Sequence, residues 1–449
     1  MGKLFGTDGV RGVANTELTP ELAFRLGKAG AHTLSKNNEK PTFIIGKDTR
    51  ISGDMLEDAL SAGILSIGGN VIKAGTIPTP GIAYLVKKQG ADAGIVISAS
   101  HNPFEYNGIK FFNSEGFKLD DSIEDEIENL VLSDSDINDN ITGAAIGKMI
   151  DCAGDELTAY ADFLTDSIDV DISDLKIVID CANGAACKVS EIVFDKLGAN
   201  TVFIGNEPDG ININENIGST HPKTLQEKVK QVNADLGLAY DGDADRLIAV
   251  DENGEIVDGD KIMYICAKQM KADGKLINNT VTATVMSNIG LGMALEKAGI
   301  NIQQSNVGDR YVLEMMQKTS CVLGGEQSGH LIFLDQNTTG DGIFASLKLI
   351  SAVKKSGKKL SELASEVTVY PQILVNAVVK TENKNNYDKN EDIMKSIKKI
   401  QEKMAGRGRV LIRPSGTEPL VRVMLEGDDY ESMSLMARDL ADLITEKLG

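Results

Sequence analysis

Short runs of β-branched and apolar residues alternate along the chain with longer stretches that have helical spacing. The first such unit has a strand-like run at residues 42–46, an amphipathic stretch at 54–67 and a second short run at 70–74. Strand, helix and strand within about 20 to 30 residues are typical of a βαβ unit in a mainly parallel sheet. The same order recurs twice, at residues 175–180, 187–197 and 201–204, and at 281–286, 291–298 and 300–302.

These repeats predict several domains, because 449 residues exceed what one hydrophobic core normally organises. We expect an α/β fold with three related mixed-sheet domains, followed by a smaller C-terminal α+β domain. A β-rich run at 366–370 precedes Pro371, and the tail from 391 onward is predicted as helix, strand, loop, strand and helix. The expected domains are residues 1–155, 156–255, 256–370 and 371–449.

Composition narrows the class of partner. A formal charge of -20 argues against nucleic acid, whose phosphates attract clustered Lys and Arg. No apolar stretch approaches the ~18 residues of a membrane helix, and the first residues lack a secretory apolar core. Five cysteines without a Cys-x-x-Cys pair are typical of free thiols in a reducing compartment, so we expect a cytoplasmic protein.

Ser100 is the first candidate for chemistry. An apolar strand-like run at 94–97 ends in a turn that contains Ser100, His101, Asn102 and Pro103. A hydroxyl is therefore expected at the carboxyl end of a strand, where open α/β sheets bind ligands. An ordinary turn before proline explains the same residues. A hydrolase nucleophile fits less well, because the Gly-x-Ser-x-Gly pattern is missing.

A second motif has three aspartates, Asp241, Asp243 and Asp245, between two apolar strand-like runs. Carboxylates this close repel one another without a cation, and their oxygens suit Mg²⁺. An EF-hand loop would need Gly where Arg246 stands. A phosphatase with an aspartyl nucleophile would leave Ser100 without a role.

Two later loops carry polar groups suited to a sugar phosphate. The loop at 324–330 offers Glu326 and Ser328 for sugar hydroxyls and His330 for proton transfer, although a polar hairpin would look the same. The loop at 413–419, with Arg422 beyond it, resembles an anion cradle, although a Pro-bounded turn is the simpler alternative.

Together, in this order along nearly the whole chain, these motifs resemble the α-D-phosphohexomutase family. The N-terminal GTDGVRG and the later GEQSGH are most similar to the branch that acts on glucosamine phosphates. Family members that act on glucose or mannose phosphates usually have Met in place of Gln327. The resemblance implies four domains around a central cleft.

The resemblance also implies how each residue acts. Ser100 would be a phosphoserine and would complete a site for one Mg²⁺ with the three aspartates. Lys110 and His330 match acid/base positions, and Glu326 and Ser328 match sugar contacts. The remaining catalytic candidates are Arg11, His101 and Arg246. The expected clamp for the distal phosphate comprises Arg413, Ser415, Gly416, Thr417 and Arg422.

The implied reaction interconverts glucosamine 6-phosphate and glucosamine 1-phosphate through a 1,6-bisphosphate of glucosamine or glucose, and supplies aminosugar precursor for the cell wall. The expected partner is this small aminosugar phosphate. Neither nucleic acid nor a membrane is expected as a partner, and the sequence leaves open whether the protein forms a homodimer. Two alternatives are a phosphoglucomutase or phosphomannomutase of the same family, and a non-catalytic sugar-phosphate-binding protein. The second would not need Ser100 together with three metal aspartates.

Overall fold

The computed structural model describes residues 4–6, 8–35, 40–133, 137, 141–150, 155–415 and 418–449. The chain packs into two compact units, each described by itself below. The first comprises Met1–Met286 and Ile300–Ser365, and the second comprises Ser287–Gly299 and Glu366–Gly449. Among the described helices, none is both long and apolar enough to cross a membrane.

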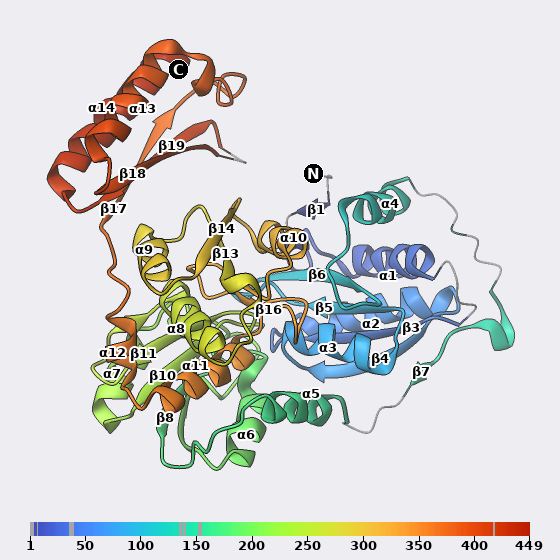
Figure 1. The fold of residues 1–449 in the computed structure, drawn as a ribbon. Coiled ribbons are helices and arrows are strands. Elements are labelled where there is room, and N and C mark those ends of the chain that lie inside the picture. The colour runs from blue at the N-terminus through green and yellow to red at the C-terminus, as the bar shows by residue number, and fades with distance from the viewer. Residues whose placement is uncertain are drawn as a thin grey trace. The chain divides into compact units, whose positions relative to one another are not determined.

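The first sheet of the larger unit has the strand order β1-β2-β6-β5-β3-β4-β7 (Figure 1). Its strands β3, β4, β5 and β7 run parallel, whereas β1, β2 and β6 add antiparallel pairs. The strands are β1 Phe5–Gly6, β2 Gly9–Val13, β3 Thr42–Lys47, β4 Asn70–Thr76, β5 Ala93–Ile97, β6 Tyr106–Asn113 and β7 Met149–Ile150. The helices between them are α1 Pro20–Leu34, α2 Gly53–Ser66, α3 Thr79–Gln89 and α4 Asp121–Leu132, with the 3₁₀ turn η1 Gly143–Ala145 after α4.

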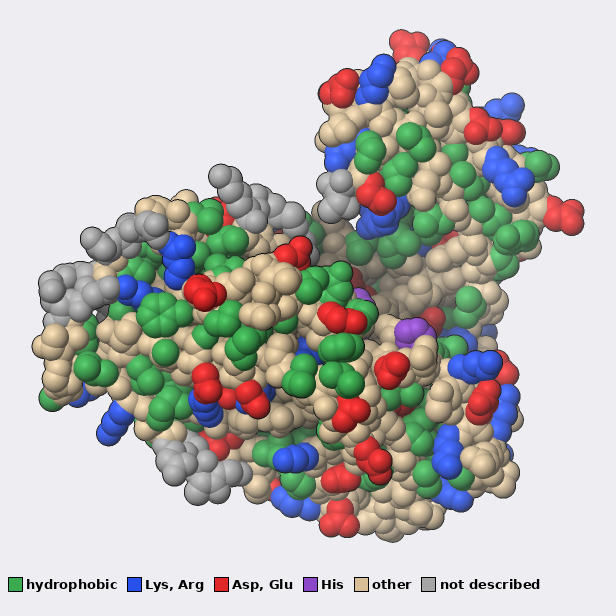
Figure 2. Space-filling view, turned by 180° about the vertical axis from the view of Figure 1, so that it is seen from behind, with side chains coloured by type: hydrophobic (Ala, Val, Ile, Leu, Met, Phe, Trp, Pro, Cys, Tyr) green, Lys and Arg blue, Asp and Glu red, His purple; other side chains and the backbone are tan. Residues whose placement is uncertain are grey.

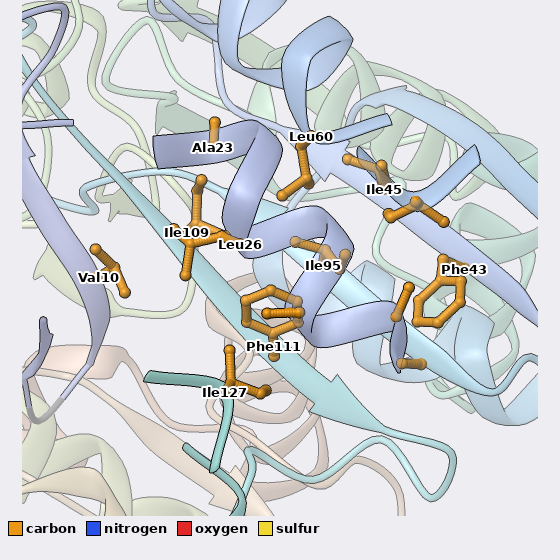
Figure 3. Packing of buried hydrophobic residues seen from close by; sticks show 14 of the residues in the cluster. Val10, Ala23, Leu26, Phe43, Ile45, Leu60, Ile95, Ile109, Phe111 and Ile127 are labelled. Carbon is orange, nitrogen blue, oxygen red and sulfur yellow. The ribbon is translucent and has the colours of Figure 1, made fainter. Parts of the chain in front are cut away.

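A core of branched and aromatic side chains holds this sheet to its helices. Phe43 of β3, Ile95 of β5 and Ile109 of β6 are fully buried, and they form one cluster with Leu26 of α1 and Leu60 of α2 (Figure 3). Burial of each large side chain stabilises the fold by roughly 1.5–3 kcal/mol, so this core holds the ends of its strands in place. These strand ends carry the candidate site.

The second and third sheets repeat the mixed pattern, with orders β12-β11-β10-β8-β9 and β14-β13-β15-β16. The second contains β8 Lys176–Asp180, β9 Asn200–Ile204, β10 Leu236–Tyr240, β11 Leu247–Asp251 and β12 Ile256–Val257, with helices α5 Asp155–Asp166, α6 Ala186–Lys196 and α7 Lys223–Val232. The third contains β13 Thr280–Thr284, β14 Asn301–Ser305, β15 Leu323–Gly325 and β16 Leu331–Phe333. Its helices are α8 Gly259–Ala272, α10 Asp309–Thr319, α11 Gly342–Ser356 and α12 Leu360–Ala364, with the 3₁₀ turn η2 Ile277–Asn279. The three predicted strand–helix–strand units are confirmed as elements in the predicted order.

The smaller unit has an antiparallel sheet of order β17-β19-β18. Its elements are α9 Ile289–Lys297, β17 Gln372–Val378, η3 Tyr387–Lys389, α13 Glu391–Met404, β18 Gly408–Pro414, β19 Leu420–Gly427 and α14 Tyr430–Leu448. The predicted tail of helix, strand, loop, strand and helix is confirmed. The prediction missed β17, in which Ile373 and Ala377 face the core of this unit.

The β-rich run at 366–370 does not form a strand in the structure. The amide of Asn288 takes the place of a neighbouring strand. Its Oδ1 accepts from the Tyr370 N–H at 3.0 Å, and its Nδ2 donates to the Tyr370 carbonyl at 2.9 Å. Both backbone groups of Tyr370 are thus satisfied by one side chain, and Pro371 has no N–H for a ladder.

Candidate active site

Three aspartates converge in the loop between the buried antiparallel strands β10 and β11. Asp241, Asp243 and Asp245 are all buried, and one oxygen of each lies within 4.8 Å of the others. Burial, followed by repulsion from Asp245 and Asp243, raises the pKa of Asp241 well above its ordinary value. Burial opposes the charge on Asp245 too, but the neighbouring His330 holds the pKa of that carboxyl low.

The donor set of this loop fits a hard divalent cation. Asp243 Oδ1 and Asp245 Oδ1 are buried and have no hydrogen-bond partner among the described residues. Unpaired buried carboxylate oxygens are costly, and oxygen ligands grouped in this way are those that Mg²⁺ prefers. The structure brings the three aspartates together, and their role as metal ligands stays a prediction.

Ser100 lies directly against this loop. It follows β5 with a left-handed backbone, at φ of 51°, and its hydroxyl donates to Asp241 Oδ2 at 2.7 Å. Gly242 allows the approach, because a Cβ there would meet the Ser100 carbonyl oxygen. The fold therefore brings the Ser100 hydroxyl and the aspartate carboxylates together from the ends of strands in two different sheets.

Two side chains that sequence reasoning missed hold the Ser100 turn. Arg50 Nη2 and Asn214 Nδ2 each donate to the Ser100 carbonyl at 2.9 Å. Arg50 is itself fixed by Asp48, which also accepts from Ser98 Oγ at 2.6 Å. The Asp-x-Arg sequence after a strand was the available signal, but it looked like an ordinary ion-paired turn.

His101 borders the Ser100 hydroxyl, and the charge of Arg11 acts on His101. His101 Nδ1 lies 3.2 Å from Ser100 Oγ. Burial, together with the positive charges of Arg246 and Arg11, lowers the pKa of His101, so its neutral form is favoured. Arg11 lies on β2, where its guanidinium pairs with Asp8.

Lys110 comes from β6 and reaches the Asp loop from the first sheet. Its ammonium lies 3.1 Å from Asp243 Oδ2 and 3.0 Å from Asp8 Oδ2, although the side chain is almost fully buried. Burial alone would lower the pKa of Lys110, but Asp243 and Asp8 raise it above its ordinary value.

Arg246, just before β11 of the second sheet, and His330, just before β16 of the third, both lie near Asp245. Arg246 Nε lies 3.8 Å from Asp245 Oδ1 and is buried without a hydrogen-bond partner among the described residues. His330 Nδ1 lies 3.4 Å from Asp245 Oδ2. Burial opposes a charged imidazole, yet Asp245 raises the pKa of His330.

The candidate sugar loop joins β15 to β16 as a hairpin. Glu326 Oε1 accepts from the Gly308 N–H at 3.0 Å, and Ser328 Oγ donates to Glu326 Oε2 at 3.3 Å. Gln327 Nε2 instead reaches Asp258 Oδ2 at 3.2 Å, at the start of α8. Glu326 and Ser328 thus form a linked pair, whereas Gln327 supports the loop.

The remaining candidates belong to the smaller unit. Arg413 of β18 and Arg422 of β19 are direct cross-strand partners, and Ser415 follows in the same loop. Burial and the charge of Arg422 lower the pKa of Arg413. Two like charges placed opposite each other favour an anion between them. The predictions for Gly416 and Thr417 lie outside the described residues.

Comparisons with known proteins agree with this architecture. The family models of the phosphoglucomutase/phosphomannomutase α/β/α domains I, II and III match residues 2–137, 158–254 and 258–370, and the model of the C-terminal domain matches 374–443. The chain belongs to the phosphoglucomutase/phosphomannomutase family.

Within this family, curated relatives that match over the full length include phosphoglucosamine mutases. Those of Thermoanaerobacter pseudethanolicus and Clostridium novyi are each 57% identical, over 100% of this chain and 100% and 99% of their own lengths.

Solved structures of the family share the fold. A phosphoglucomutase/phosphomannomutase family protein from Burkholderia thailandensis aligns with a TM-score of 0.82 at 22% identity, and covers 99% of this chain and 98% of its own. Aspergillus fumigatus N-acetylphosphoglucosamine mutase, in complex with GlcNAc-6P and magnesium, aligns with a TM-score of 0.71 at 17% identity, and covers 99% of this chain and 96% of its own.

Proposed function

We propose that this protein is an intramolecular phosphotransferase that interconverts glucosamine 6-phosphate and glucosamine 1-phosphate. The observation that carries the proposal is the 2.7 Å hydrogen bond from Ser100 Oγ to Asp241, within a buried group of three aspartates. Curated phosphoglucosamine mutases that are 55–57% identical over the whole chain supply the substrate class.

The proposed reaction consists of two phosphoryl transfers in opposite directions. In the first, the bond from phosphorus to Ser100 Oγ breaks, and a bond to a sugar hydroxyl oxygen forms. The proton of the sugar hydroxyl passes to Ser100 Oγ, and the result is a 1,6-bisphosphate. In the second, the bisphosphate presents its other phosphate. Its bond to the sugar oxygen breaks, a bond from phosphorus to Ser100 Oγ forms, and the Ser100 proton passes to the sugar oxygen, which releases the isomeric monophosphate. A glucosamine or glucose 1,6-bisphosphate would also phosphorylate an idle enzyme.

Asp241, Asp243, Asp245 and the phosphorylated Ser100 would hold one Mg²⁺. Bound there, the ion supplies positive charge that offsets the charge of the phosphoserine and of the group in transfer. Arg246 adds a fixed guanidinium beside the same carboxylates, at 4.0 Å from Asp241. Phosphoryl transfer depends chiefly on such charge neutralisation and on placement.

Lys110 and His330 are proposed for proton transfer. Each contacts a different aspartate of the loop, Lys110 at Asp243 and His330 at Asp245. Arg11 and His101 are proposed to orient the phosphate on Ser100, since His101 lies beside its hydroxyl. Glu326 and Ser328, already linked to each other, would bind ring hydroxyls of the sugar.

The phosphate that is not reacting is proposed to bind Arg413, Ser415, Gly416, Thr417 and Arg422. The adjacent arginines of β18 and β19 support this role, because an anion would relieve their repulsion. Binding energy from a remote phosphate can position the reacting end. We also propose domain boundaries at 1–155, 156–255, 256–370 and 371–449; the four family models match within these ranges.

In the cell, we propose that the enzyme works in the cytoplasm and provides aminosugar precursor for cell-wall synthesis. The four cysteines among the described residues are buried and unpaired, which supports a reducing compartment. On the face drawn in Figure 2, acidic and basic side chains are interspersed among hydrophobic ones. We further propose that the protein has no nucleic-acid partner, which the formal charge of -20 supports.

The experiment is a side-by-side measurement of kcat/KM for the 1-phosphates of glucosamine, glucose and mannose with matched bisphosphate. We expect glucosamine 1-phosphate to be favoured by about ten- to hundredfold, since a charge-assisted hydrogen bond to its ammonium is worth ~1.5–3 kcal/mol. Equal use of glucose or mannose phosphate would identify a different branch of the family. Binding without turnover of any of them would support a sugar-phosphate-binding protein.

A further inference from the structure

Lys118 connects two parts of the site that the proposed function leaves separate. Its ammonium lies 2.7 Å from Asp8 Oδ1 and forms a second ion pair with Asp309 Oδ2. The two carboxylates come from distant segments, the N-terminal loop before β2 and the first turn of α10. Lys118 therefore holds together segments that the chain itself does not join.

Each of these carboxylates also faces one of the two proposed proton-transfer residues. Asp8 Oδ2 lies 3.0 Å from the ammonium of Lys110. Asp309 Oδ2 lies 3.9 Å from Nε2 of His330. The five residues form one continuous chain, in which Lys118 lies at the centre between the two carboxylates.

The backbone of Lys118 is fixed as firmly as its side chain. After β6, the turn at Asn113 and Gly116 reverses the chain, and Lys118 pairs with Phe112 across an isolated antiparallel bridge. The Gly116 carbonyl accepts a hydrogen bond from Thr338 Oγ1, in the segment whose Gly340 N–H donates to His330 Nε2 at 3.1 Å. The turn before Lys118 is thus tied to the support of His330.

A simple surface ion pair would not have this arrangement. Exposed pairs contribute little and seldom restrain their partners. Lys118 joins two carboxylates, its side chain is only 20% exposed, and it lines a small cavity with Asp309, Arg310 and His330. The ammonium of Lys118 is held by two carboxylates and can fix the positions of both. Through these carboxylates it can also fix the groups that they face.

We propose that Lys118 is a positioning residue, which sets the places of Lys110 and His330 through Asp8 and Asp309. The part of this inference that concerns catalysis rests on the proposed mutase function. Among the described residues, Lys118 forms no ion pair or hydrogen bond with the aspartate loop or with Ser100, and its two ion pairs are those with Asp8 and Asp309. It also lines one cavity with His330, so its charge acts on that ring directly as well as through Asp309.

The test compares Lys118→Met with Lys355→Met. Lys355 is a matched control, because it also joins two carboxylates, Asp169 at 3.0 Å and Asp273 at 3.2 Å, and its side chain is 26% exposed. We expect Lys118→Met to lower kcat by about 10- to 100-fold with KM changed less than about threefold, because displaced reacting groups slow the chemical step. Lys355→Met should leave both constants unchanged, and Lys118→Arg should recover most of kcat.

A double-mutant cycle with Asp309→Asn examines the route of the effect. If Lys118 acts through Asp309, the second substitution should cost little once the first is made. Fully additive losses would overturn the proposed route, and a kcat of Lys118→Met within about twofold of the wild type would overturn the role itself. Should Lys118→Met fail to fold, Lys118→Gln takes its place in the cycle with Asp309→Asn, under the same criteria.

A readout independent of turnover separates this inference from the proposed function. The chain has only four histidines, so the ring NMR signal of His330 can be assigned with a His330→Gln variant. Lys118→Met should shift that signal, and Lys355→Met should not. A wild-type protein without mutase activity would contradict the proposed function, whereas an unmoved His330 signal would contradict the positioning role alone.

Discussion

Arg246 and His330 pair through a single antiparallel bridge, which joins the loop of the three aspartates to the candidate sugar loop. Next to this bridge, the Leu247 N–H donates to the Gly329 carbonyl at 3.0 Å. Arg246 immediately precedes β11 at the end of the aspartate loop, and His330 immediately precedes β16. The two loops are therefore one assembly, and a change in the backbone of one should disturb the other.

Gly329→Ala tests this coupling. Gly329 has φ of 94°, and a Cβ there would collide with the Leu247 carbonyl oxygen. We expect a loss of at least ~1–2 kcal/mol in the free energy of unfolding and a fall in kcat of about tenfold or more, as Arg246 and His330 are displaced. Denaturant unfolding and steady-state kinetics measure both. Gly357→Ala is the control, because Gly357 also has positive φ but open space around it, and it should lose stability without losing kcat.

Metal removal should abolish turnover, and Mg²⁺ should restore it. Mg²⁺ should also raise Tm, because a ligand that binds only the folded state stabilises it by mass action. Asp243→Asn should reduce that Mg²⁺-dependent rise, while Tm without metal stays equal or increases because repulsion within the group falls. Thermal melts across a Mg²⁺ titration check both expectations. Full activity of metal-free enzyme would contradict the metal site.

Arg422→Ala should raise KM for the monophosphate about tenfold or more and lower kcat less, because a phosphate contact is lost far from the reacting oxygen. Its Tm should not fall by more than a degree or so, since the substitution removes a like charge opposite Arg413. Arg422→Lys should recover only part of the affinity, because lysine lacks the planar fork. Arg407→Ala, at an exposed guanidinium in the same unit, is the control, and equal KM values for both variants would argue against the clamp.

Asp341 predicts a specific pH dependence of stability. Burial, only partly offset by hydrogen bonds from Phe344 N–H and Tyr160 O–H, raises the pKa of Asp341 to about 6. The folded protein therefore holds this proton more tightly than the unfolded chain does. The contribution of Asp341 to the unfolding free energy should fall by about 2–3 kcal/mol as pH rises from about 4 to 6.

The matched variant is Asp341→Asn, which keeps an oxygen for the start of α11. Urea unfolding at several pH values should show that the unfolding free energy of the wild type falls relative to that of this variant between pH 4 and 6, by about 2–3 kcal/mol. A difference between the two proteins that does not change with pH would contradict the assigned titration.

The sequence predicted those parts of the site that are local along the chain. The aspartate loop lies between its two strands as expected, and Ser100 follows a buried strand, because short apolar runs and abrupt polar turns record those features directly. The helices and strands from residue 391 onward could be predicted for the same reason. β17 was missed because its alternation is weak, with Leu374 and Val378 exposed.

Long-range partners could not be predicted in the same way. Arg50 and Lys118 each look like ordinary surface cations, and their roles appear only when strand order brings Ser100 or Asp309 beside them. The run at 366–370 forms no strand for a related reason, because Asn288, which is distant in the sequence, satisfies the backbone of Tyr370. Hydrogen-bond partners of this kind are set by tertiary packing and leave no local pattern.

The central claim is that Ser100 carries the phosphoryl group, and peptide mapping by mass spectrometry tests it most directly. After incubation with glucose 1,6-bisphosphate, the peptide that contains Ser100 should gain one phosphoryl group, and incubation with the sugar monophosphate should remove it. Ser100→Ala should show no such modification and should lose several orders of magnitude in kcat, because the covalent route disappears. A Ser100→Ala protein with full activity, or a phosphoryl group mapped to another residue, would contradict the account.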